Sequence, residues 1–153
     1  MNIVSQEFEK LKQELIASYD AKNMRASGSF AESLEVRETE RGAQLWGAHH
    51  SIQLEYGRGT TKTSTASSPT LKEQILKWIH DKGIQPVDIS VESLAFLITR
   101  KIHREGWNRS GYGGIGLISG IITDERIDQI IQKYKESINA EYVAVIQEKI
   151  RTI

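Results

Sequence analysis

The sequence contains no cysteine among its 153 residues. This absence excludes a disulfide framework, a thiol nucleophile and every zinc site that needs thiolate ligands. The sequence also has no excess of either charge, since 20 basic residues balance 20 acidic ones. A net charge of zero gives no overall attraction to nucleic acid or to an anionic membrane, so any such contact must be local. No apolar run approaches the roughly 20 residues that cross a bilayer, and we expect a soluble protein.

The composition is that of a globular chain. Hydrophobic residues make up 39% and charged residues 26% of the sequence, which is enough apolar material for one core under a solvated surface. The length is close to the commonest domain size of about 100–150 residues, and nothing divides the chain, so we predict one domain over residues 1–153. The N-terminal residues turn charged early and lack the apolar core of a signal peptide, so we expect no secretion by that route.

Hydrophobic periodicity predicts four longer helices. Apolar residues recur every three or four positions in each, as an amphipathic helix requires. Gly83 is expected to end the second helix, while Ser90 and Thr123 are expected to cap the third and the fourth. The four helices are predicted at 5–22, 71–82, 90–105 and 124–151.

Other segments predict short helices and strands. Residues 34–47 alternate between apolar and polar side chains around a turn and predict a β-hairpin. Residues 26–34 predict a turn or a single helical turn, and 49–56 fit a strand or a helix, of which we favour the short helix. The apolar, β-branched run 117–122 predicts a further strand. The fold class is therefore α+β: a small antiparallel sheet, made of the hairpin plus a late strand, packed with an N-terminal helix, two middle helices and a long C-terminal helix.

Two glycine-rich segments invite a nucleotide-binding interpretation. Residues 111–116 satisfy the pattern G-x-G-x-x-G, but a helix precedes them and an apolar segment follows, whereas the dinucleotide fingerprint needs a strand before it and a helix after it. Residues 57–63 match a phosphate-binding loop only loosely, because Thr61 stands where glycine should precede Lys62. Both segments are better interpreted as glycine turns, and we expect no bound nucleotide and no other cofactor.

No residues show the spacing of a catalytic or metal site. The four histidines lack an i, i+4 partner histidine or a suitably placed carboxylate, so we expect no metal ion; they are His49, His50, His80 and His103. The glutamates of the predicted hairpin alternate along a strand, which is typical of a solvated face rather than of a catalytic pair. We therefore expect no enzymatic activity.

Basic and aromatic residues gather near the end of the third predicted helix. Cations with nearby aromatic rings can bind the phosphates and bases of nucleic acid. The alternative is a solvated last turn, whose cations favour the helix C-terminus. The residues concerned are Arg100, Lys101, His103, Arg104, Trp107, Arg109 and Tyr112.

The order of the segments resembles the tail-completion, or head-tail joining, proteins of long-tailed bacteriophages, over roughly residues 5–135. Those proteins show a Thr-Gly-x-Leu-x-x-Ser turn before a hairpin, and residues 27–33 occupy that place, with Ser27 and Phe30 for the usual Thr and Leu. A short apolar helix then ends in Glu-x-Gly before an exposed loop, and two further helices and a strand follow. The residues that match these later pieces are His50, Ile52, Leu54, Glu55, Gly57, Arg58, Gly59, Pro69, Leu71, Ile75, Trp78, Leu94, Ala95, Ile98, Ile102, Gly106, Leu117 and Ile118.

The resemblance implies a structural virion protein that forms part of an oligomeric ring at the neck or tail end, around the DNA channel, without catalytic residues. Its partners would be copies of itself and other neck, portal or tail proteins, and it would assemble in the host cytoplasm. The low-complexity loop 57–70 is too polar to build a core, so we expect it to be exposed, mobile and ordered by a neighbouring subunit or by DNA through Arg58 and Lys62. The alternatives are a small DNA-binding or packaging accessory protein that uses residues 100–109, and a hydrolase, for which no coherent motif is present.

The apolar surface of the last predicted helix becomes wider along its length. Its first half has a narrow apolar stripe that one core can cover, whereas Val143, Ile146 and Ile150 in the second half widen the apolar surface around the helix. One core cannot easily bury both halves, so we expect the far end to protrude and to contact another subunit. A break near Asn139, which would fold the end back onto the domain, is the alternative.

Overall fold

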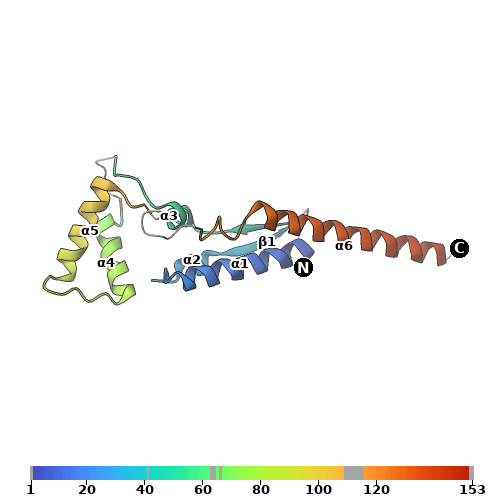
Figure 1. Cartoon of the computed structure of the whole chain (residues 1–153), viewed down its shortest axis with the longest axis horizontal. Helices are drawn as coiled ribbons and strands as arrows, with labels where there is room; N and C mark the ends of the chain where they lie inside the picture. The colour runs from blue at the N-terminus through green and yellow to red at the C-terminus, as the bar shows by residue number, and fades with distance from the viewer. Residues whose placement is uncertain (1, 41, 63–64, 66, 109–115, 152–153) are drawn as a thin grey trace.

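The structure, a computed structural model, describes residues 2–40, 42–62, 65, 67–108 and 116–151. Six helices and two strands lie within these ranges. In chain order they are α1 (Ile3–Ala21), α2 (Ser29–Ser33), β1 (Glu35–Thr39), β2 (Gly42–Trp46), α3 (Ser51–Tyr56), α4 (Leu71–Lys82), α5 (Val91–Glu105) and α6 (Asp124–Arg151). The molecule is elongated: the α4–α5 hairpin forms one end, α1 and the β-hairpin form the middle, and α6 extends to the other end (Figure 1). The predicted α+β class with a long C-terminal helix is confirmed.

Helix α1 packs along the β-hairpin. It begins two residues earlier than predicted, because the Asn2 side chain accepts a hydrogen bond of 2.8 Å from the Ser5 amide and caps the helix. Strands β1 and β2 pair antiparallel, with Glu35 opposite Trp46 and Thr39 opposite Gly42, so the predicted hairpin is confirmed. In the described residues this two-stranded sheet is the whole sheet.

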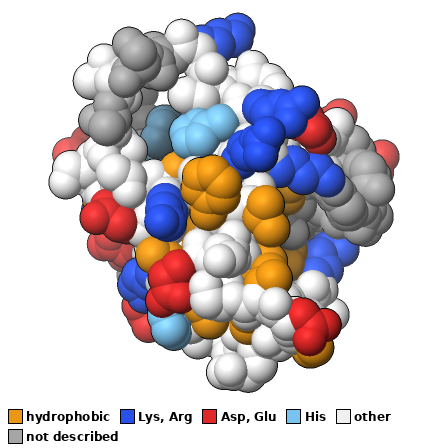
Figure 2. Space-filling view, turned by 90° about the vertical axis from the view of Figure 1, so that its left-hand side faces the viewer, with side chains coloured by type: hydrophobic (Ala, Val, Ile, Leu, Met, Phe, Trp, Pro, Cys, Tyr) orange, Lys and Arg blue, Asp and Glu red, His pale blue; other side chains and the backbone are white. Residues whose placement is uncertain are grey.

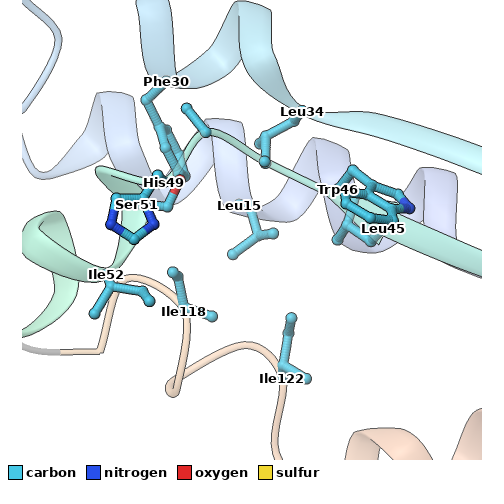
Figure 3. A pocket seen from close by; sticks show the side chains of 12 residues that line it. Leu15, Phe30, Leu34, Leu45, Trp46, His49, Ser51, Ile52, Ile118 and Ile122 are labelled. Carbon is cyan, nitrogen blue, oxygen red and sulfur yellow. The ribbon is translucent and has the colours of Figure 1, made fainter.

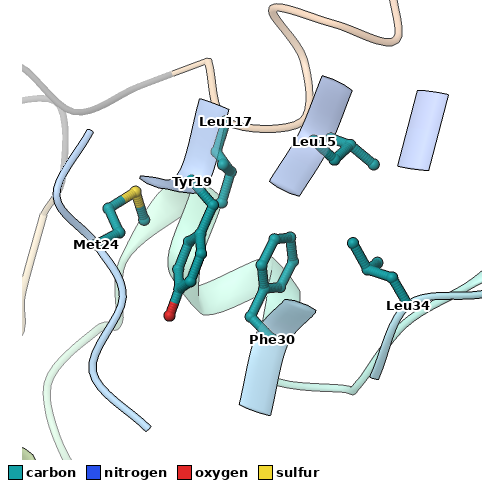
Figure 4. Packing of buried hydrophobic residues seen from close by; sticks show 6 residues of the cluster. All are labelled: Leu15, Tyr19, Met24, Phe30, Leu34 and Leu117. Carbon is teal, nitrogen blue, oxygen red and sulfur yellow. The ribbon is translucent and has the colours of Figure 1, made fainter. Parts of the chain in front are cut away.

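The core lies between α1, α2 and the chain just before α6. Six side chains are buried together there (Figure 4): Leu15, Tyr19, Met24, Phe30, Leu34 and Leu117. The rings of Tyr19 and Phe30 lie 4.8 Å apart between centroids, in a tilted arrangement that aromatic pairs favour. Burying each large apolar side chain stabilises the fold by roughly 1.5–3 kcal/mol, so this cluster fixes the middle of the molecule.

The predicted late strand at 117–122 is wrong, because these residues form a turn that pairs with no strand. The amide of Ile118 donates to the Glu55 carboxylate over 2.8 Å, and the amide and hydroxyl of Ser119 donate to the same carboxylate. The backbone groups that a strand would offer to a neighbouring strand are thus used by a buried side chain. Leu117 in this turn is fully buried and belongs to the core.

The helices α4 and α5 form an antiparallel hairpin (Figure 1), and their bounds agree closely with those of the two predicted helices. A capping box between Thr70 and Glu73 begins α4, and Gly83 ends it in the left-handed conformation with φ of 65°. The Ser90 side chain caps α5 by accepting from the Ser93 amide over 3.1 Å.

Helix α6 is continuous from Asp124 to Arg151, so the alternative of a break near Asn139 is wrong. The Thr123 hydroxyl accepts from the Arg126 amide over 3.2 Å and caps its start, as predicted. Its first half is held on α1 by ion pairs, whereas its second half extends beyond the rest of the molecule (Figure 1). At 1.5 Å per residue the helix is about 42 Å long. No helix in the described ranges is both long and apolar enough to cross a membrane.

Candidate interaction surfaces

The C-terminal half of α6 exposes a cluster of large apolar side chains. The three residues predicted to make subunit contacts, Val143, Ile146 and Ile150, are 52%, 56% and 66% exposed, and Tyr142 and Val145 beside them are exposed to a similar extent. At about 100° per residue these five side chains lie within an arc of about 160° around the helix, in which Lys149 is the one charged side chain. An apolar stripe of that width on a helix of a globular protein normally faces a core. We define Tyr142, Val143, Val145, Ile146 and Ile150 as the α6 surface.

The first half of α6 is fixed to α1 by charged groups. The carboxylate of Glu7 is buried and lies 3.0 Å from Lys133 Nζ on α6, and it also accepts a hydrogen bond from Lys10. The hydrogen bond from Lys10 lowers the pKa of Glu7, burial opposes this effect, and Lys133 lowers the pKa further. Arg126 adds an ion pair of 2.8 Å with Glu14 on α1. The protruding half therefore extends from a firmly held base.

A second exposed apolar area lies at the opposite end of the molecule, on the α4–α5 hairpin. Looking onto that end, hydrophobic side chains gather at the centre, with charged side chains around them (Figure 2). The large hydrophobic residues of this hairpin that are exposed are Trp78, Val87, Ile89, Phe96 and Leu97. We call them the α4–α5 surface.

An open apolar cavity of about 340 Å³ lies between α1, β2, α3 and the turn before α6 (Figure 3). Leu15, Leu45 and Ile122 line it, and the exposed side chains of Trp46 and Ile52 stand at its edge. His49 and Ser51 supply its polar side chains, and neither is part of a recognisable catalytic arrangement. The cavity can accept apolar groups, but nothing in the described residues indicates a reaction there.

The segment that follows α3 lies against the segment that follows α5, although the two are far apart in the sequence. We call this contact the crossing. Arg58 and Trp107 exchange two backbone hydrogen bonds, each of 2.6 Å, in an isolated antiparallel bridge. The crossing requires glycine on both sides. A Cβ atom on Gly57 would lie 1.9 Å from the carbonyl oxygen of Trp107, and one on Gly106 would lie 2.5 Å from that of Arg58. Both glycines also have φ values in the left-handed region, at 85° and 72°.

The crossing fixes the beginning of the loop that follows α3. The Thr61 amide donates to the carbonyl of His103 over 3.2 Å, and the Thr61 hydroxyl forms a hydrogen bond of 2.6 Å with the His103 ring. The Arg58 side chain is half-buried and donates to Thr61. The expectation that the whole loop 57–70 is exposed is therefore wrong for Gly57, Arg58 and Thr61, which are partly buried near the end of α5.

The later loop residues fit the prediction better. Lys62 is exposed, and so are residues 65 and 67–69. Residues 63–64 and 66 lie outside the described ranges, and the predicted mobility stays a prediction. Of the basic cluster, Arg109 and Tyr112 also lie outside those ranges, as does most of the segment 111–116.

Glu55 is a structural residue whose role the sequence did not predict. It is 1% exposed, and its carboxylate accepts the hydrogen bonds from Ile118 and Ser119 described above. Burial raises the pKa of Glu55, but the hydrogen bonds from the Ser119 hydroxyl and from the backbone amides of the turn outweigh burial and lower it. The one feature of the sequence that pointed to Glu55 was its place in the Glu-x-Gly motif at the end of α3.

The described residues contain no group of three histidine, aspartate or glutamate side chains that could hold a metal ion. Comparison of the chain with protein-family models, with curated proteins and with solved structures gave no significant match. A function can therefore be inferred only from the surfaces described above and from the motif order of the sequence.

Proposed function

We propose that the chain is a structural virion protein of a tailed bacteriophage, one subunit of an oligomeric ring at the head-tail junction or the tail end. The observation that carries the proposal is the α6 surface. Five large apolar side chains are exposed along the last turns of a continuous helix that extends past its own domain. A helix with such a surface gains by packing against another protein, because each buried CH₂ group contributes about 0.8 kcal/mol.

The position of the α6 surface supports a ring. The α6 surface and the α4–α5 surface differ in sequence and lie at opposite ends of an elongated molecule (Figure 1). Contact between two different surfaces of identical subunits is heterologous, and such contacts close into rings when the rotation between neighbours allows it. The order of motifs that resembles tail-completion proteins independently favours this interpretation. The ring would enclose the DNA channel and contact other neck, portal or tail proteins.

The proposal is tested on purified phage particles. We expect this polypeptide among the virion proteins in the copy number of a ring, and a reconstruction of the particle should contain the fold at the neck or tail end. Absence from particles that carry the other neck proteins would reject the proposal. In parallel, native mass spectrometry of the full chain at increasing concentration should detect oligomers above the monomer, since subunit contacts obey mass action.

A further inference from the structure

The crossing brings together basic residues that are far apart in the sequence. The contact of Thr61 with His103 places the loop start, which carries Arg58 and Lys62, against the last two turns of α5. That part of α5 carries Arg100, Lys101 and Arg104, all of which are exposed. Figure 2 shows Lys and Arg side chains around the upper part of this end of the molecule, on the side where α5 ends in Figure 1. We define these five residues as the basic surface.

Most cations of the basic surface have no partner within the protein. In the described residues, Lys62, Arg100, Lys101 and Arg104 form no side-chain hydrogen bond or ion pair, whereas many other cations of the chain do. Nearby on α5, Glu105 is the one acidic residue in the segment 100–105. The net charge of this region is therefore strongly positive, although the whole chain is neutral.

Helix stability alone does not explain this arrangement. Cations in the last turn of a helix are favourable next to its negative end, which accounts for Arg104. Arg100 and Lys101 lie before that turn, and Arg100 is four residues from Arg104, a spacing at which like charges repel each other on a helix. Arg58 and Lys62 add further positive charge from another segment. Repulsion of this kind is relieved when a polyanion binds.

We propose that the basic surface binds the phosphate backbone of duplex DNA. Exposed Arg and Lys side chains on a helix face and an adjoining loop are the groups that contact phosphates, and such contacts do not depend on base sequence. The proposal deepens the proposed function, since DNA that passes through a ring would meet this surface in every subunit. Binding by one subunit would be weak, and several subunits around one duplex would bind together with greater avidity.

The experiment measures binding of the full-length chain to fluorescent duplex DNA of two unrelated sequences, at salt concentrations from 50 to 200 mM. With up to four phosphate contacts by the unpaired cations, the logarithm of the binding constant should fall against the logarithm of salt with a slope of about −3 to −4. The variant R100Q/R104Q should reduce that slope by about 2 and weaken binding on the order of 10- to 100-fold at 100 mM salt. Both arginines are exposed and glutamine is a good helix former, so the variant should remain folded.

The matched control is K22Q/K135Q, which removes the same charge from exposed positions outside the basic surface and should bind DNA like the wild type. Equal weakening in the control would overturn the proposal in favour of a general charge effect. The proposal would also fail if the wild type showed no salt-dependent DNA binding, or if polyglutamate bound as tightly as DNA, since the surface would then fit an acidic protein. R100Q/R104Q should retain the oligomers of the wild type, so failure of this site and failure of the ring can be told apart.

Discussion

Two backbone hydrogen bonds of 2.6 Å join Arg58 to Trp107. They hold the start of the loop that follows α3 against the end of α5. This short bridge connects the middle of the molecule with the α4–α5 end. It also determines where the basic surface forms, because residues on both sides of it supply the cations.

Replacing Gly57 with Ala should destabilise the protein by about 2 kcal/mol or more, because the new Cβ atom would meet the Trp107 carbonyl at 1.9 Å and the φ of 85° is strained for alanine. Gly106→Ala should act similarly. Chemical denaturation measures the free energy of unfolding. Gly59→Ala is the control, since a Cβ atom there meets nothing within 4 Å. If Gly57→Ala were as stable as Gly59→Ala, the crossing would not exist in solution.

Replacing Glu55 with Gln should cost about 2–3 kcal/mol of unfolding free energy, because an amide cannot accept all the hydrogen bonds that the buried carboxylate receives from Ile118 and Ser119. Differential scanning calorimetry should therefore give a lower Tm. The exposed Glu40→Gln should change stability by less than about 0.5 kcal/mol and serves as the control. An unchanged Tm for Glu55→Gln would show that the turn before α6 is held by its apolar side chains and not by Glu55.

The stability should fall in acid, and Glu7 should account for part of this loss. The pKa of Glu7 is lowered in the folded state by Lys10 and Lys133, against an unfolded value of about 4.3. A carboxylate with a lowered pKa stabilises the fold above the unfolded pKa, and that contribution is lost as the pH falls through the folded pKa. The free energy of unfolding should thus be steady near neutral pH and decrease below about pH 4.5, less steeply in Glu7→Gln than in the wild type. An equal acid dependence in both proteins would contradict this role.

The elements that could be predicted from the sequence are those with local signals. Ser90, Gly83 and Thr123 act on backbone groups a few residues away, so the ends of α4 and α5 and the start of α6 agree with the prediction. The widening apolar surface of the last predicted helix also indicated that its second half extends beyond the core of the subunit.

The elements that could not be predicted depend on distant partners. The run 117–122 has the composition of a strand, but its amides bind Glu55, which precedes Ile118 by 63 positions. The basic surface forms only because the crossing at Gly57 and Gly106 brings two segments together. In the sequence, residues 58–62 and 100–104 are separate groups with few basic residues each. A periodic pattern shows which face is apolar, but it does not show which other segment will lie against a given residue.

A charged residue within the α6 surface should prevent assembly of the proposed ring. Ile146→Asp places a charge at the centre of this surface, and a buried unpaired carboxylate at a subunit contact is strongly unfavourable. In the free subunit Ile146 is more than half exposed, so the same change should cost less than about 1 kcal/mol of unfolding free energy. We expect a folded monomer by native mass spectrometry that no longer enters particles in a complementation assay.

Ala144→Asp is the matched control, because it adds the same charge two residues away, at an exposed position on the side of the helix opposite to the apolar arc. It should assemble like the wild type, since its side chain points away from the apolar arc. Removal of residues 141–153 should act like Ile146→Asp and leave a folded domain with a near-normal Tm, because these residues are exposed from 141 to 151. If this truncation unfolded the protein, the end of α6 would belong to the core of the subunit. If Ile146→Asp assembled as well as Ala144→Asp, the subunit contact would lie elsewhere, and the proposal that the α6 surface builds the ring would fail.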